Sequence, residues 1–460
     1  MLRLHDTALG EVVDIEPAQP GRFSMYVCGL TVYDVPHIGH GRAALVYDLL
    51  RRYLEWTGVD VHHVSNVTDI DDNIIQRAER EGRSSTEVAE QYERAWWDAV
   101  DRLGVLRPHD IPHATEYVER MVELIGQLFE RGYAYQAPDG VYFATEALDG
   151  YGLLAGQPLE SLRAGARVES DESKRSPTDF ALWKLSKPGE PWWESPWGKG
   201  RPGWHTECVV MSLDLLGDGF DLHAGGLDLK FPHHENERAQ AVALGKKFTR
   251  HWMHHAFVEV AGEKMSKSLG NFTSLTDLLA RTDARAYRLL VLQSHYRSPM
   301  EVTVSTVDQA VRGLTGLDTF ALRFRDAFDD ADAAALASRA DAEELARFRQ
   351  RMDDDLDTPP VTGQLFDLIR RGNAAADTGG GEDAERIAAT VATVAGALGL
   401  APYLTGDVPA DVVAACARID EARAQRDFAT ADAIRAELSA GGWIVENSPT
   451  GTRVRQAPTP

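Results

Sequence analysis

The chain has few cysteines and no long apolar run. These two features argue against a disulfide-bonded protein and against a membrane protein. Its 460 residues include 3 cysteines, which are Cys28, Cys208 and Cys416. An odd and sparse set favours free thiols in a reducing compartment over a disulfide framework. No apolar run approaches the roughly 18 residues of a membrane span, and the first residues lack the apolar stretch of a secretory signal. We therefore expect a cytoplasmic protein with no membrane segment.

Positive charge is also scarce, with 48 Lys+Arg against 71 Asp+Glu and a net charge of -23. Because phosphate contacts need local positive charge, this balance argues against general nucleic-acid binding. A nucleic-acid partner is compatible with this net charge only if basic residues gather on one face of the protein. Lysines occur only from Lys174 to Lys267, and two of them fall in the string Lys264-Met-Ser-Lys-Ser268. Where arginine is the usual cation, such a string indicates a need for compact ammonium groups that bind phosphate.

A second phosphate-type motif, His37-Ile-Gly-His40, lies near the start of the chain. It follows a strand-like run at 23–28 and precedes an amphipathic stretch with helical spacing. A strand, a glycine-bearing turn and a helix N-terminus present N–H groups and a helix dipole to phosphate in Rossmann-type sheets. Imidazoles there can donate to phosphate oxygens as negative charge develops. Either motif alone is also compatible with ordinary packing or a solvated loop, but both together favour a nucleotide site.

A possible metal site follows from Cys28, Cys208, His233 and Glu237. The first cysteine ends the early strand, and the last two residues are four apart, so on a helix they share one face. Two thiolates, one imidazole and one carboxylate can form a tetrahedral zinc site. The residues alone are equally compatible with two core cysteines and a solvated helix, since no tight cysteine spacing is present. His234 could also replace His233.

The pattern along the chain predicts an α/β fold. We expect a Rossmann-type parallel-sheet catalytic domain split by an insertion, followed by a helical bundle and a small α+β C-terminal unit. The expected boundaries are 1–112 for the first half of the catalytic domain, 113–200 for the insertion, 201–250 for the second half, 251–310 for the segment with the lysine string, 311–395 for the bundle and 396–460 for the C-terminal unit. The acidic run Asp353-Asp354-Asp355 is expected to be a solvated turn, and Cys416 a small core residue.

Five longer motifs together resemble those of the cysteinyl-tRNA synthetases, which are class I aminoacyl-tRNA synthetases. The likeness covers essentially the whole chain. It implies an ATP-dependent ligase that forms cysteinyl-adenylate and transfers cysteine to the 3′ end of cysteine tRNA. It also favours His233 over His234 within the zinc set. The motifs are Met25-Tyr-Val-Cys-Gly-Leu-Thr-Val-Tyr-Asp34, Asn66-Val-Thr-Asp-Ile-Asp-Asp72, Arg201-Pro-Gly-Trp-His-Thr-Glu-Cys208, Phe231-Pro-His-His-Glu-Asn-Glu237 and Lys264 through Asn271.

The resemblance also implies roles for individual residues. Zinc held by Cys28, Cys208, His233 and Glu237 would distinguish the thiol of cysteine from the hydroxyl of serine, because zinc deprotonates a bound thiol outright. Asn73 departs from the lysine expected of the family, so it receives no charged role. The implied catalytic residues are His37, His40, Lys264 and Lys267; the ATP contacts, with Mg²⁺, are Gly39, Gly225, Gly226, Asp228 and Lys267; and the cysteine contacts are Thr68, Trp204 and His223.

Two other functions compete with this interpretation. A cysteine ligase of mycothiol biosynthesis would share the zinc and ATP motifs, but the long region after residue 311 favours the tRNA enzyme. A catalytically inactive binding module is the second, and the intact histidine and lysine motifs argue against it. We expect a monomer whose partners are cysteine tRNA, L-cysteine and ATP. Trp443, Arg453 and Arg455 of the last unit are candidates for anticodon contact.

Overall fold

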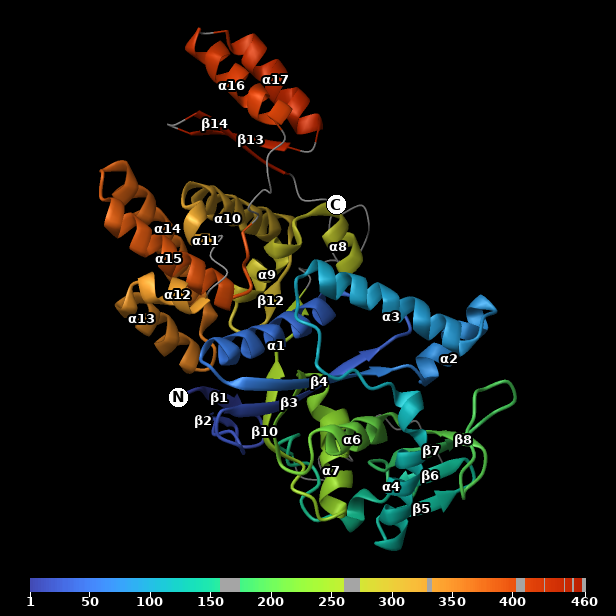
Figure 1. Ribbon diagram of the computed structural model, residues 1–460. Coiled ribbons are helices and arrows are strands. Elements are labelled where there is room, and N and C mark those ends of the chain that lie inside the picture. Colours follow the sequence, from blue (N-terminus) through green and yellow to red (C-terminus); the bar gives the residue numbers. More distant parts are fainter. Residues whose placement is uncertain are drawn as a thin grey trace. The chain divides into compact units, whose positions relative to one another are not determined.

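The computed structural model describes residues 1–157, 174–259, 274–328, 333–402, 410–425, 427–441, 443–448 and 451–456. The lysine string at 264–268 therefore lies outside the described residues. The chain divides into two compact units (Figure 1). Unit 1 comprises Met1–Leu278, Val291–Val304 and Gln350–Pro359, and unit 2 comprises Leu279–Leu290, Ser305–Arg349 and Pro360–Pro460. Across the parts of the chain that can be described, no helix is long and apolar enough to cross a membrane.

Unit 1 is built on a parallel sheet of four strands. These are β3 (Arg22–Thr31), β4 (Asp60–Thr68), β9 (Phe220–Gly226) and β10 (Thr249–His255), in the spatial order β10-β9-β3-β4. All three pairings are parallel. Every residue of β9 is buried, as expected for a central strand covered on both faces. The carboxyl ends of the strands meet at one edge, where open α/β sheets bind ligands. The predicted α/β fold with a parallel sheet is confirmed.

Three helices follow the first two strands of this sheet. Helix α1 (Ile38–Trp56) connects β3 to β4, and α2 (Asp72–Glu81) and α3 (Ser85–Arg102) come after β4. His37 caps α1: its ring accepts from the backbone N–H of His40, and the His40 ring accepts from that of His37. A Cβ on Gly39 would lie 2.9 Å from Cε1 of His37, so glycine lets the capping ring fold over the first turn.

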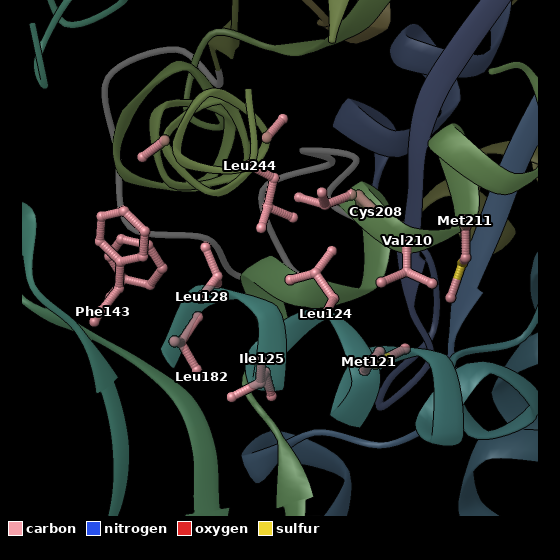
Figure 2. Packing of buried hydrophobic residues seen from close by; sticks show 14 of the residues in the cluster. Met121, Leu124, Ile125, Leu128, Phe143, Leu182, Cys208, Val210, Met211 and Leu244 are labelled. Atoms are coloured by element: carbon pink, nitrogen blue, oxygen red, sulfur yellow. The ribbon is translucent and has the colours of Figure 1, made fainter. Parts of the chain in front are cut away.

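The region 113–202, which includes the expected insertion, forms an antiparallel sheet and shares a core with the helix α6 that follows it. Its strands pair in the order β5-β6-β7-β8. Figure 2 shows Met121, Leu124 and Leu128 of α4 beside Cys208 and Met211 of α6, in one buried cluster. This shared core supports the helix that carries Cys208. The elements are η1 (Ala114–Tyr117), α4 (Val118–Glu130), β5 (Ala134–Ala137), β6 (Gly140–Phe143), η2 (Thr145–Ala147), β7 (Phe180–Leu185), β8 (Gly200–Pro202) and α6 (Trp204–Leu215).

The other elements of unit 1 surround the sheet. Strands β1 (Arg3–Asp6) and β2 (Glu11–Asp14) form an antiparallel pair. The short turn η3 (Lys230–His234) leads directly into α7 (Glu235–Ala243). Strand β11 (Val258–Glu259) pairs in parallel with β12 (Met300–Glu301).

The expectation of a solvated turn at the acidic run is wrong for Asp355. Its residue is only 4% exposed. Its carboxylate accepts from the backbone N–H of His5 at 2.8 Å, from the hydroxyl of Tyr296 at 2.5 Å and from Nε of Arg297 at 2.7 Å. These partners are distant in sequence, so a local run of three acidic residues gave no sign of them.

Unit 2 is mainly helical. Near its end, α16 (Ala410–Ala424) and α17 (Phe428–Ala440) pack with the antiparallel pair β13 (Trp443–Ser448) and β14 (Gly451–Gln456). Cys416 is buried in the apolar cluster that these elements share, as expected of a core residue. Helices α8 and α9 are assigned partly to each unit. The preceding helices are α8 (Leu275–Arg281), α9 (Ala284–Leu292), α10 (Val304–Arg323), α11 (Arg325–Phe328), α12 (Ala333–Arg339), α13 (Ala342–Asp353), α14 (Thr358–Asp377) and α15 (Gly381–Ala397).

Candidate metal and nucleotide site

Four predicted metal ligands converge at the carboxyl edge of the parallel sheet. Cys28 comes from β3, Cys208 from α6, His233 from η3 and Glu237 from α7, and their ligand atoms all lie within 4.8 Å of one another. The two Sγ atoms are 3.6 Å apart. Nε2 of His233 lies 3.6 Å from Sγ of Cys208 and 3.0 Å from Oε1 of Glu237. Two sulfurs, one nitrogen and one oxygen at this spacing fit the donor set that zinc prefers.

A second overlapping set satisfies the same spacing, namely Cys28, His223, His234 and Glu237. Nε2 of His234 lies 3.2 Å from Sγ of Cys28, and Nε2 of His223 lies 2.6 Å from Oε2 of Glu237. The geometry thus brings both adjacent histidines to the cluster. Only the first set contains both thiols, and a soft, thiolate-rich set suits zinc better.

Neighbouring aromatic rings orient the ligands. The ring of Trp204 stacks on that of His233 with centroids 4.1 Å apart. Nδ1 of His205 lies 2.9 Å from Nδ1 of His233, which leaves Nε2 directed at the thiols and the carboxylate. Nδ1 of His234 lies 2.8 Å from Nε2 of His254. Such outer partners fix the ring orientation of a metal-binding histidine.

The charges of the cluster are mutually dependent. Burial opposes ionisation of Glu237, but His223 and His233 outweigh it and hold the pKa of the carboxyl well below its usual range. Burial likewise opposes the charged form of His233, yet Glu237 raises its pKa to about 10. Burial raises the pKa of the Cys28 thiol, and Cys208 reinforces the rise. The Cys28 thiol and the His233 ring therefore hold protons that a bound cation would displace, because metal ligands must be deprotonated.

The expected cysteine contact Thr68 ends β4 and is fully buried. Its hydroxyl oxygen lies 2.7 Å from Oε2 of Glu207 and accepts from Nδ2 of Asn66 at 3.3 Å. The Asn66 amide is fixed in turn, since its oxygen accepts from the backbone N–H of Gly29 at 2.9 Å. Sequence reasoning did not assign Glu207 or Asn66 a role, although both belong to the quoted motifs. The sequence feature that could have identified them is their position within those motifs.

The expected nucleotide residues lie at the same edge. Gly225 and Gly226 end β9, and exposed Asp228 follows them. A Cβ on Gly226 would lie 2.3 Å from Oδ1 of Asp228, so glycine lets this carboxylate lie against the end of the strand. The hydroxyl of Tyr47 on α1 donates to the carbonyl of Gly225 at 2.6 Å and ties the motif-bearing helix to the end of the sheet.

The two motif histidines are neutral and share one tautomer. Each Nδ1 accepts from a backbone N–H at 3.3 Å, so the proton of each neutral ring is on Nε2. Their rings stack with centroids 3.5 Å apart. Burial lowers the pKa of His40 to about 3, and neighbouring His37 adds to the effect. Burial also lowers the pKa of His37. Each ring can therefore offer a neutral N–H donor to a phosphate.

Comparisons with known proteins identify the family. Residues 14–312 match the family model for the class I (C) tRNA synthetase catalytic domain, and residues 347–402 match the DALR domain. The cysteine–tRNA ligase of Alkalilimnicola ehrlichii is 46% identical over 470 residues, which covers 99% of this chain and 100% of the relative. The chain belongs to the class I cysteine–tRNA ligases. The corresponding ligase of Halorhodospira halophila is 44% identical over 467 residues, with 99% and 100% coverage.

A solved structure supports the fold of this cysteine–tRNA ligase family member. Methionyl-tRNA synthetase of Mycobacterium tuberculosis, in complex with methionyl-adenylate, matches with a TM-score of 0.60 and 16% identity, over 95% of this chain and 98% of that one. At this identity the likeness concerns the fold alone. The family predicted from the sequence motifs is confirmed, while the roles of individual residues stay predictions.

Proposed function

We propose that this chain activates L-cysteine with ATP and transfers it to the 3′ end of cysteine tRNA. The observation that carries the proposal is the buried cluster of two thiols, an imidazole and a carboxylate at the sheet edge that also bears the capped histidine motif. Full-length similarity to cysteine–tRNA ligases supports the tRNA enzyme over the mycothiol ligase.

Cysteine selection depends on the cluster. Cys28, Cys208, His233 and Glu237 would hold zinc, which when bound supplies a soft partner for the substrate thiolate and a poor one for a hydroxyl. Trp204 stacks on His233 and covers that side of the cluster. Thr68, held by Asn66 and Glu207, is placed to contact the polar end of the amino acid. His223 supports the site indirectly by holding Oε2 of Glu237.

Adenylate formation would use the other half of the edge. A carboxylate oxygen of cysteine attacks the α-phosphorus of ATP, and pyrophosphate leaves; the ribose hydroxyl of tRNA then attacks the adenylate carbonyl and AMP leaves. The Nε2–H groups of His37 and His40 are placed to donate to phosphate oxygens. Lys264 and Lys267, with Mg²⁺, would balance the charge of the leaving group. Gly39, Gly225, Gly226 and Asp228 would line the nucleotide.

The remaining proposals concern the location of the protein, its oligomeric state and the region that contacts the anticodon. We propose a cytoplasmic location, which the three free thiols support. We also propose that the chain acts as a monomer. Residues 396–460 would contact the anticodon, because α16, α17 and the β13–β14 pair form a small core of their own.

Two activities measured together test the function. The purified chain should catalyse cysteine-dependent ATP–pyrophosphate exchange and should charge cysteine tRNA. A positive exchange combined with no tRNA charging, and transfer to an amino sugar instead, would favour the mycothiol ligase. Exchange that another amino acid supports better than cysteine would contradict the assigned substrate.

A further inference from the structure

Arg42 is a buried cation on α1, two residues beyond the His-Ile-Gly-His motif. Its residue is 0% exposed. The guanidinium donates to the backbone carbonyls of Phe257 and Ser298 at 2.6 Å each, and to those of His295 at 3.2 Å and Tyr296 at 3.3 Å. One side chain thus binds four carbonyls from two segments that are more than 200 residues away in sequence.

Those segments adjoin the stretch of chain that carries the lysine string. Phe257 immediately precedes β11, after which the chain continues into residues 260–273. The turn at 295–298 ends one residue before β12, the partner strand of β11. On the far side of 260–273, Ser274 forms a bridge with His37, and the backbone N–H of Leu275 donates to the carbonyl of Pro36 at 2.9 Å. The described residues on either side of 260–273 are therefore attached near the N-terminus of α1.

We propose that Arg42 is a positioning residue for adenylate formation. It holds Phe257 and the turn at 295–298 at a fixed place relative to the helix that presents His37 and His40. The inference rests on the proposed function, in which Lys264 and Lys267 act on ATP. Arg42 does not touch substrate in this role; it acts through Lys267.

The chemistry of this contact requires arginine. A planar guanidinium has five N–H donors in a fixed fork, whereas a lysine ammonium has three donors around one point. A buried cation is costly unless it is hydrogen-bonded, so the four carbonyls determine where Arg42 can lie. The turn that supplies three of them is itself held in place, because Asp355 binds the Tyr296 hydroxyl and Nε of Arg297.

The metal cluster offers an internal comparison. Its ligands come from β3, α6, η3 and α7, and none belongs to the segments that Arg42 joins. A change at Arg42 should therefore disturb the use of ATP and leave zinc content and cysteine binding nearly intact.

A double-mutant cycle tests the proposal on the full zinc-loaded chain. Arg42→Lys and Arg42→Gln are each made alone and together with Lys267→Ala, and cysteine-dependent pyrophosphate exchange is measured over ATP and cysteine concentrations. We expect kcat/KM for ATP to fall about 10²-fold in the single variants, since a displacement of about 1 Å can cost this much. KM for cysteine should change less than about twofold. In the Lys267→Ala background the same substitutions should cost less than about threefold, because the group being positioned is gone.

Arg52→Lys is the matched control on the same helix. Nε of Arg52 lies 2.8 Å from Oδ2 of Asp48, and Nη2 donates to the carbonyl of Gly104 at 2.8 Å. This variant should keep exchange within about twofold. Zinc content and the urea midpoint are measured on every protein. Multiplicative losses in the double variants, or an equal loss of cysteine binding or zinc, would assign Arg42 a purely structural role and overturn the inference. Absence of exchange in the unmodified chain would instead overturn the proposed function.

Discussion

The two halves of the sheet edge differ in how they manage charge. In the metal half, ionised groups are already paired and buried: Glu237 lies between His223 and His233, and both thiols lie beside them. In the nucleotide half, His37 and His40 are kept neutral, with Nδ1 engaged in capping. In the proposed function, the first half would surround a bound cation and the second would face the phosphates of ATP. The difference is consistent with the proposal that the cluster selects the amino acid, and that positive charge for ATP would come mainly from the helix terminus and the lysines.

The largest expected effect comes from removing a thiolate of the metal half. Cys208→Ser should lose zinc and lower kcat/KM for cysteine by more than about 10²-fold, because even outer partners of a metal site are worth 10–100-fold. KM for ATP should change little. Metal analysis and exchange kinetics check this, with Cys416→Ser, a buried cysteine of the C-terminal cluster, as the control. Full zinc occupancy in Cys208→Ser would remove Cys208 from the ligand set.

Removing a lysine of the proposed ATP machinery should impair the use of ATP and leave the use of cysteine intact. Lys267→Ala should reduce exchange by roughly 10²-fold, since it removes a charge that acts on the transition state. Zinc content and cysteine binding should remain. The exposed Lys246 provides a control lysine-to-alanine change that should leave exchange intact. Exchange near the unmodified rate in Lys267→Ala would refute the role of this lysine.

Deleting residues 396–460 should leave both halves of the edge working and impair only the use of tRNA. Charging should fall at least about tenfold, because stacking on one aromatic such as Trp443 is worth about 1–3 kcal/mol per base. Pyrophosphate exchange should persist, since the assigned cysteine and ATP residues precede residue 270. A truncated chain that charges tRNA at the full rate would refute the anticodon assignment, and loss of exchange as well would indicate a folding role.

The smallest expected effect is a pH dependence of stability from the neutral histidines. The pKa of His40 is lowered to about 3 in the folded chain, below the value of about 6.5 for an unfolded histidine. The contribution of neutral His40 to the free energy of unfolding is therefore complete above about pH 6.5. It is lost as the pH falls toward 3, at no more than about 1.4 kcal/mol per pH unit. Urea unfolding at pH 7 and 5.5 should show that the free energy of unfolding falls less with pH in His40→Asn than in the unmodified chain. An equal decrease in the free energy of unfolding for both proteins would mean that the folded chain does not hold His40 neutral.

Much of the site could be predicted from the sequence because its residues lie in compact motifs. The spacing of His233 and Glu237 placed both on one side of the chain, and the capping histidines marked the start of a helix. The choice between His233 and His234 could not be made from composition, since the chain brings both to the cluster. Both histidines lie close enough to bind a metal, and the set with His233 is favoured in the structure because it contains both thiols.

Other features depended on partners far away in the chain. Arg42 meets carbonyls at 257 and 295–298, and Asp355 meets the backbone of His5. Periodicity and local composition report which face of an element is buried, but they do not report which distant segment covers it. The buried polar contacts that set the relative positions of motifs were therefore the part of the structure that sequence reasoning missed.

In the proposed function, the Cys28–Cys208–His233–Glu237 cluster selects cysteine through a bound zinc ion. The direct measurement is pyrophosphate exchange with cysteine and with serine, before and after zinc is removed by chelation and then restored. We predict that the metal-free chain loses cysteine-dependent exchange and its preference over serine, and that added zinc restores both. Undiminished, cysteine-selective exchange in a chain verified to be free of metal would contradict the account.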